Sequence, residues 1–153
     1  MLNSEKIKSM RIAGKILSNT FDYISEKVCE GVTAFAIDQE IKTFIESNGA
    51  VPGFLGYQGY KYSSCISKNE EIVHGIPYPD KLFFDGDIVS IDIGVKYNGY
   101  YADAARTFLI GNVSDEAKFL AQVTQDSFFK GMADIKAGDH LGDISNAIQT
   151  HIE

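Results

Sequence analysis

The sequence predicts an α/β (α+β) fold with helices at both ends of the chain and a sheet between them. Apolar residues recur at intervals of three and four before residue 48 and again after Ser114. Between Ala50 and Gly111, glycine, aromatic and β-branched residues dominate, which is typical of strands and turns. The chain has 153 residues and is 44% hydrophobic, so it can form one domain or part of a larger one.

Two helices are expected before Ala50. The first covers residues 4–28, and Gly31 stops it. Its apolar face consists of Ile7, Met10, Leu17, Phe21, Ile24 and Val28. The second begins at Thr33, whose hydroxyl can accept from free amide groups, and ends at Asn48 and Gly49. Its inward residues are Ile37, Ile41, Phe44 and Ile45.

The rest of the chain predicts short strands followed by two more helices. Residues 64–67 and 72–74 have the composition of strands joined by tight turns. A third helix is expected from Ser114 to about Ala133, with acidic residues in its first turn. A fourth begins at Asp143 and reaches Glu153 without a stop signal, so we expect the chain to be a piece of a longer protein.

Composition excludes several functional classes. The formal charge is -7 and the acidic residues are scattered, which argues against nucleic acid as a main ligand. The N-terminal residues lack the pattern of a signal peptide, and no stretch is apolar enough to span a bilayer, so we expect a cytoplasmic protein without a membrane partner. Cys29 and Cys65 are expected to be reduced thiols that serve packing.

A β-hairpin is the strongest local prediction. Residues 88–95 alternate, so that four apolar side chains point to one side and Asp92 points to the other. Asn98 and Gly99 both tolerate the positive φ angles of a two-residue type I′ turn. With these two residues as the turn, Gly94 lies opposite Asp103 and Asp92 lies opposite Ala105.

In that register, Asp92 and Asp103 share one face as diagonal neighbours, with Cβ atoms no more than roughly 7–8 Å apart. Carboxylates this close repel each other unless they are protonated, share a proton or are neutralised by a cation. Three interpretations stay open: two solvated aspartates, an acid–base pair without metal, or a site for Mn²⁺, Fe²⁺, Co²⁺ or Zn²⁺. His74 precedes a glycine and a proline segment that is expected to hold its imidazole near a strand end, although a single histidine has many non-catalytic uses.

Residues 69–77, 85–92 and 98–103 together resemble the type I methionine aminopeptidases in order, spacing and residue identity. The similarity extends to residues 11–14, 55–60 and 124–127, and thus to essentially the whole chain. It implies the pita-bread fold, in which residues 1–153 would form the N-terminal portion of a single catalytic domain. That first half would have a mixed or antiparallel curved sheet covered by helices on one side, with the C-terminal half absent.

The resemblance also implies roles for particular residues. Asp92 would be a terminal ligand of one of two divalent metal ions (Co, Mn, Fe or Zn), and Asp103 would bridge both. His74 would contact the substrate and help to handle the charge of the transition state. Tyr57 and Tyr60 would line the pocket for the methionine side chain, with ordinary core packing as the alternative.

The family's other metal ligands, one histidine and two glutamates, and a second catalytic histidine lie in the second half of its fold and have no counterpart here. We do not assign His140 or His151 as ligands. The isolated chain is therefore expected to be inactive. We also expect it to pack loosely, with the apolar face of the hairpin and the last helix, around Ile144 and Ile148, short of cover.

The implied activity is metal-dependent removal of the initiator methionine. The partners would be nascent polypeptide N-termini, with the ribosome as one place of encounter, and the full-length enzyme would be a monomer. Two alternatives remain: an Xaa-Pro peptidase or creatinase-like relative, and a non-enzymatic pita-bread module that binds peptides or proteins. Three positions, Phe54, Gln58 and Val73, differ from the residues common in the family. The preference of the pocket among substrates and inhibitors therefore stays open.

Overall fold

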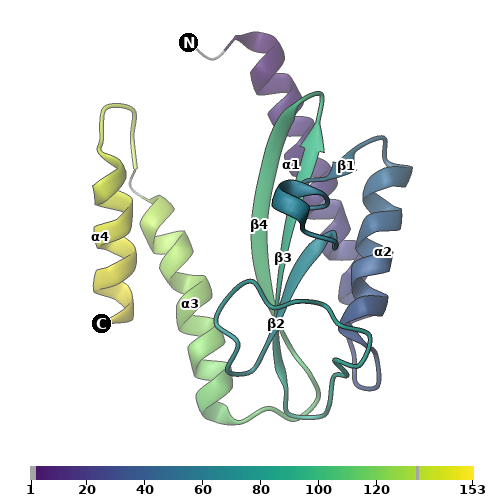
Figure 1. Cartoon of the computed structure of the whole chain (residues 1–153). Coiled ribbons are helices and arrows are strands. Elements are labelled where there is room, and N and C mark those ends of the chain that lie inside the picture. The colour runs from purple at the N-terminus through teal and green to yellow at the C-terminus, as the bar shows by residue number, and fades with distance from the viewer. Residues whose placement is uncertain (1–2, 134) are drawn as a thin grey trace. The chain divides into compact units, whose positions relative to one another are not determined.

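The computed structural model describes residues 3–133 and 135–153, and the chain divides into two compact units, Met1–Asn112 and Val113–Glu153. The first unit contains helices α1 (Ser4–Ser25) and α2 (Ala34–Ser47), a 3-10 turn η1 (Tyr57–Gly59) and four strands (Figure 1). The strands are β1 (Val51–Pro52), β2 (Ser64–Lys68), β3 (Ile88–Tyr97) and β4 (Tyr100–Leu109). The second unit contains α3 (Asp115–Ala133) and α4 (Leu141–Ile152). Among the described residues, no helix has the length and apolarity needed to cross a membrane.

Both N-terminal helices begin at side-chain caps. The Asn3 carboxamide oxygen accepts from the Lys6 N–H at 2.8 Å, and the Thr33 hydroxyl accepts from the Ala36 N–H at 3.2 Å, which confirms the predicted start of α2. The α1 helix ends at Ser25, three residues before the predicted end at Val28. Val28 nevertheless stays in the core, because the turn after the helix keeps its N–H bonded to the Ile24 carbonyl at 3.0 Å.

Strand β3 is the centre of an antiparallel sheet. It pairs with β4 along one edge and with β2 and β1 along the other. The hairpin register is the predicted one: Gly94 lies opposite Asp103 and Asp92 lies opposite Ala105. Asn98 and Gly99 have φ angles of 48° and 82°, as a type I′ turn requires.

The helices α1 and α2 cover one face of this sheet (Figure 1). The four apolar side chains of β3 that point to this face are all 0% exposed: Val89, Ile91, Ile93 and Val95. They form one core with Phe21, Ile24, Ile37 and Ile41 of the helices. The expectation that this face lacks cover is therefore wrong, because apolar side chains of α1 and α2 pack against it within the first unit.

The strand predicted at residues 72–74 is also wrong. His74 has a φ of 58°, in the left-handed region, which interrupts an extended chain. Gly75, the next residue, reaches the free edge of β2: its N–H donates to the Ser67 hydroxyl at 3.0 Å and its carbonyl accepts from the Ile66 N–H at 2.8 Å. A Cβ on Gly75 would collide with the Ile66 carbonyl, so glycine is required for this close approach.

The second unit is a pair of packed helices. The Ser114 hydroxyl accepts from the Ala117 N–H at 3.1 Å at the predicted start of α3. At the other end of α3, a Cβ on Gly131 would lie 2.6 Å from Ile148 Cγ1 and 3.3 Å from Ile144 Cγ2. The two isoleucines are half-buried against this glycine, so α3 provides part of the cover that the apolar side of α4 was expected to lack.

Acid should weaken the first unit through Asp87, a buried carboxylate. It accepts from the Asn69 amide at 2.7 Å, the Phe84 N–H at 2.8 Å and the Lys68 ammonium at 3.0 Å. Burial opposes ionisation, but these donors outweigh it and hold the pKa of Asp87 below its usual value. A lowered folded-state pKa gives stability that is present above the ordinary carboxyl pKa and is lost as the pH falls through the lowered one.

We therefore expect Asp87→Asn to lower the free energy of unfolding at pH 7 by about 1–3 kcal/mol, and to have a smaller effect at pH 3. Urea unfolding followed by circular dichroism at both pH values measures this. Asp115→Asn is the control, because the Asp115 side chain is fully exposed beside Lys118. The same loss in both variants at pH 7 would contradict the assignment.

Candidate active site

A hollow of about 630 Å³ lies beside the β3–β4 hairpin. Asp92 alternates with Ile91 and Ile93 along β3, so it points away from the face that α1 and α2 cover. The hollow is lined by Phe54, Tyr57, Gln58, Gly59, Tyr60, Cys65, His74, Asp92 and Asp103. The structure thus brings together the five predicted site residues, which are Tyr57, Tyr60, His74, Asp92 and Asp103. Their individual roles stay predictions.

The two aspartates form an uncompensated acidic pair. Asp92 is half-buried, and its Oδ1 atom is buried without a hydrogen-bond partner in the described part of the chain. Burial, followed by the charge of Asp103, raises the pKa of Asp92 to about 6, while His74 opposes the rise. Asp103 is exposed on β4. A buried carboxylate oxygen without a donor, next to a second carboxylate, fits a divalent cation.

The aromatic wall of the hollow comes from a strained turn. Gly56 and Gln58 have φ angles of 83° and 47°, and this turn leaves the Tyr57 side chain 69% exposed. Core packing therefore does not explain Tyr57. Tyr60 is half-buried and its hydroxyl donates to the Ser64 carbonyl at 2.8 Å. Burial raises the pKa of Tyr60, so its phenol stays neutral.

Asp38 of α2 binds the backbone segment that positions Tyr60. The Oδ1 atom of Asp38 accepts from the Ser63 N–H and the Ser64 N–H, each at 2.9 Å, and from the Ser64 hydroxyl at 2.8 Å. Asp38 is 0% exposed, and its burial raises its pKa against the effect of these donors. The carboxylate fixes the start of β2, and with it the carbonyl that holds Tyr60.

Sequence reasoning missed Cys65 as a site residue. It lies directly opposite Asp92 in the β2–β3 register, in the wall of the hollow. Burial raises the pKa of its thiol, and the charges of Asp92, Asp38 and Asp103 act in the same direction. The thiol therefore stays protonated, and the side chain forms an uncharged part of the wall of the hollow. The β2–β3 register would have revealed it. The packing expectation holds for buried Cys65 and is wrong for Cys29, which is exposed.

Phe54 fills the space beside the aspartate pair. A Cβ on Gly94 would lie 2.6 Å from Phe54 Cε1, so the ring occupies the room that the glycine leaves open. Gly94 is the residue opposite Asp103. Phe54 therefore narrows the hollow next to that carboxylate, which gives a structural reason to expect an effect on the pocket preference.

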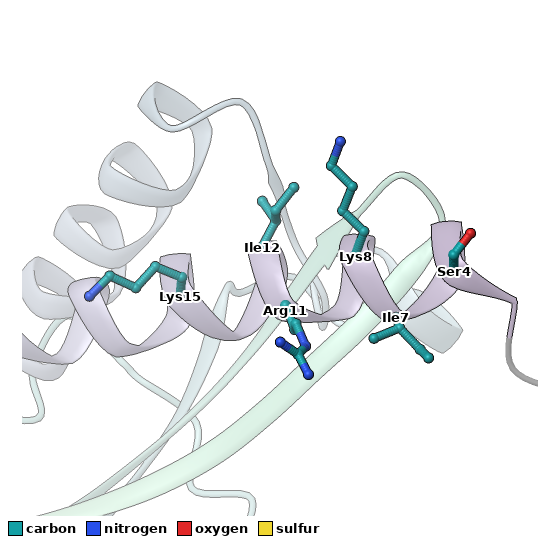
Figure 2. Close-up of a pocket in the computed structure, with 6 residues that line it drawn as sticks. All are labelled: Ser4, Ile7, Lys8, Arg11, Ile12 and Lys15. Carbon is teal, nitrogen blue, oxygen red and sulfur yellow. The ribbon is translucent and has the colours of Figure 1, made fainter.

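Residues 3–133 and 135–153 contain no group of three or more histidine, cysteine, aspartate or glutamate side chains that could by itself hold a metal. Asp92 and Asp103 are two donors and not a complete ligand set. A second hollow, of about 420 Å³, lies along the N-terminal part of α1 (Figure 2). It is lined by Ser4, Ile7, Lys8, Arg11, Ile12 and Lys15, so its walls offer no carboxylate, thiol or imidazole that could bind a metal.

Comparison with known proteins identifies the family of this chain. Residues 8–153 match metallopeptidase family M24. Methionine aminopeptidase 1 of Bacillus subtilis (strain 168) is 46% identical over 144 residues, covering 94% of this chain and 58% of that protein. The crystal structure of methionine aminopeptidase from Thermotoga maritima superposes with a TM-score of 0.95 at 37% identity, covering 98% of this chain and 60% of that one.

The chain belongs to metallopeptidase family M24, a family of metal-dependent peptidases. It has the pita-bread fold of the structures it resembles, which confirms the predicted fold class. Prolidase from Pyrococcus furiosus, at 22% identity and a TM-score of 0.86, shares this fold. The chain spans about 60% of the length of the methionine aminopeptidases described above.

Proposed function

We propose that this chain forms the N-terminal portion of the catalytic domain of a methionine aminopeptidase, which removes the initiator methionine from nascent proteins. The observation that carries the proposal is the hairpin register, which sets Asp92 and Asp103 on one face of a hollow that also contains His74. The 46% identity to a methionine aminopeptidase supports this substrate class.

In the proposed site, Asp92 and Asp103 hold two divalent ions together with ligands from outside residues 1–153. Such ions, when bound, activate water and polarise the scissile carbonyl. Asp92 would be a ligand of one ion and Asp103 would serve both, while His74 would donate a hydrogen bond to the substrate as charge develops. Tyr57, Tyr60 and the other walls of the hollow accept a flexible apolar side chain.

We further propose the substrate, the location and the oligomeric state of the enzyme. The substrates are the N-termini of nascent polypeptides, encountered at the ribosome, and the complete enzyme is a cytoplasmic monomer. Cobalt, manganese, iron and zinc all suit carboxylate and imidazole ligands, so cellular supply selects among them. The net charge of -7 argues against nucleic acid as the main ligand.

Two other functions receive less support. An Xaa-Pro peptidase shares the fold, but the prolidase is 22% identical, compared with 46% for the methionine aminopeptidase. A non-enzymatic peptide-binding module would gain nothing from Asp92 Oδ1, a buried acceptor without a partner in the described residues.

We expect the complete protein, loaded with Mn²⁺ or Co²⁺, to release methionine from Met-Ala-Ser about 100-fold or more faster than it releases lysine from Lys-Ala-Ser, because the walls of the hollow offer Lys no carboxylate beyond the metal-binding pair. Chromatography of the released amino acid measures both rates. Met-Pro-Ser is the matched peptide for the prolidase alternative. Preferred cleavage of that peptide, or release of lysine at an equal rate, would contradict the proposal.

A further inference from the structure

His74 lies in a loop of residues 71–81, and Lys81 at the end of this loop bonds to Glu71 at its start. The ammonium of Lys81 donates to Glu71 Oε1 at 2.9 Å, to Glu71 Oε2 at 2.8 Å and to the Ile66 carbonyl of β2 at 3.0 Å. Glu71 Oε2 also accepts from the Lys68 N–H at 2.8 Å. A single ammonium thus joins both ends of the loop to the edge of the sheet.

Lys81 and Glu71 together are called the clip below, and they flank His74 along the chain. Glu71 is three residues before the histidine, and Lys81 is seven residues after it. Between them the backbone has no regular secondary structure, and its tie to β2 is the pair of hydrogen bonds at Gly75. The Ile66 N–H bonds to Gly75 and the Ile66 carbonyl bonds to Lys81, so the clip and the glycine hold neighbouring points of one strand edge.

The pair differs from an ordinary surface ion pair. The Lys81 side chain is only 11% exposed, compared with 54% for Lys118 in its pair with Asp115. Partial burial opposes ionisation of Glu71, but Lys81 and the Lys68 N–H outweigh it and hold the pKa of Glu71 below its usual value. Glu71 is therefore ionised at neutral pH, and a charge-assisted hydrogen bond of this kind is stronger than one between neutral groups.

His74 needs such support, because its φ of 58° is unfavourable for a residue with a Cβ and persists only where the surroundings impose it. We propose that Lys81 and Glu71 are positioning residues, which hold His74 at the rim of the hollow that contains Asp92 and Asp103. They do not touch the substrate. Their effect passes through the backbone of residues 71–81 to the imidazole.

The first test is amide hydrogen exchange of the 153-residue chain, measured by NMR, and it does not depend on the proposed function. We expect Lys81→Met to accelerate exchange at the Gly75 and Ile66 amides by about tenfold or more, while the β3–β4 ladder exchanges as before. Lys81→Arg should restore most of the protection, because it keeps the charge and the donors. Glu71→Gln should give an intermediate effect, and Lys118→Met is the matched control.

Unchanged exchange at Gly75 and Ile66 in Lys81→Met would overturn the proposal. Equal acceleration along the β3–β4 ladder would overturn it as well, because Lys81 would then support the whole fold and not the loop. Glu71→Gln applies the same two criteria in a variant that keeps Lys81 and its bond to the Ile66 carbonyl.

The second test rests on the proposed function and uses the complete protein. We expect Lys81→Met to lower kcat on Met-Ala-Ser about 10- to 100-fold with KM changed less than about threefold, because a misplaced group costs rate more than binding. Lys81→Arg should recover most of kcat. A rise in KM at unchanged kcat would overturn the positioning role, whereas a wild-type protein without peptidase activity would refute the proposed function and leave the exchange test to decide on the clip.

Discussion

Replacing Asp103 by alanine should abolish peptidase activity in the complete protein and remove most of its bound metal. Asp103 lies diagonally across the hairpin from Asp92 and is the ligand proposed to serve both ions, so its loss affects each of them. We expect a fall in kcat/KM of about a thousandfold or more, since water activation and carbonyl polarisation are lost together.

His74→Ala should behave differently. The imidazole borders the hollow but is proposed to act on the substrate, so metal content should stay near that of the unmodified protein. The expected loss in kcat is about 10²- to 10⁴-fold, the range for a positioned acid, base or hydrogen-bond donor. Mass spectrometry of bound metal, together with release of methionine from Met-Ala-Ser, separates the two variants.

Asp115→Ala is the matched control for the loss of a carboxylate. Its side chain is fully exposed at the start of α3. Metal content and turnover should be unchanged in this variant. Equal loss of metal in Asp103→Ala and His74→Ala would show that His74 is itself a ligand, and would contradict the division of roles.

The hairpin could be predicted because local rules determine it completely. Asn98 and Gly99 select the type I′ turn, and the alternation of residues 88–95 decides which face is apolar. These two facts set the register, and the register sets Asp92 beside Asp103 without knowledge of any distant contact. The caps at Thr33 and Ser114 were predictable for the same reason, since each acts on an amide three residues away.

The His74 loop could not be predicted, because its shape depends on contacts that leave no periodic pattern. Gly75 takes a place on β2 only after β2 has formed, and Lys81 reaches Glu71 across ten residues of chain that have no periodic pattern. The composition of residues 72–74 favours a strand, but the positive φ of His74 overrides it. Cys65 was missed because its position opposite Asp92 depends on the pairing of strands separated by a long loop.

Residues 1–153 alone should show no appreciable peptidase activity and only weak binding of Mn²⁺ or Co²⁺. The described residues bring two carboxylates together without a third metal-binding side chain, so bound ions would keep most of their hydration. The two aspartates would in turn keep much of their repulsion, as the raised pKa of Asp92 indicates. Turnover should be lower than that of the complete protein by about a thousandfold or more.

The structure changes one part of this expectation, the state of the isolated chain. The apolar face of β3 is covered by α1 and α2, so loose packing of the sheet is not expected. The large apolar side chains that stay exposed in the second unit include Phe119, Leu120, Phe128 and Phe129 of α3, and exposed apolar surface of this kind favours self-association. Isothermal titration with Mn²⁺, a peptidase assay and light scattering of the purified chain test these points together. Robust turnover by a monodisperse monomer would show that residues 1–153 carry a sufficient ligand set, and the proposed need for further ligands would be wrong.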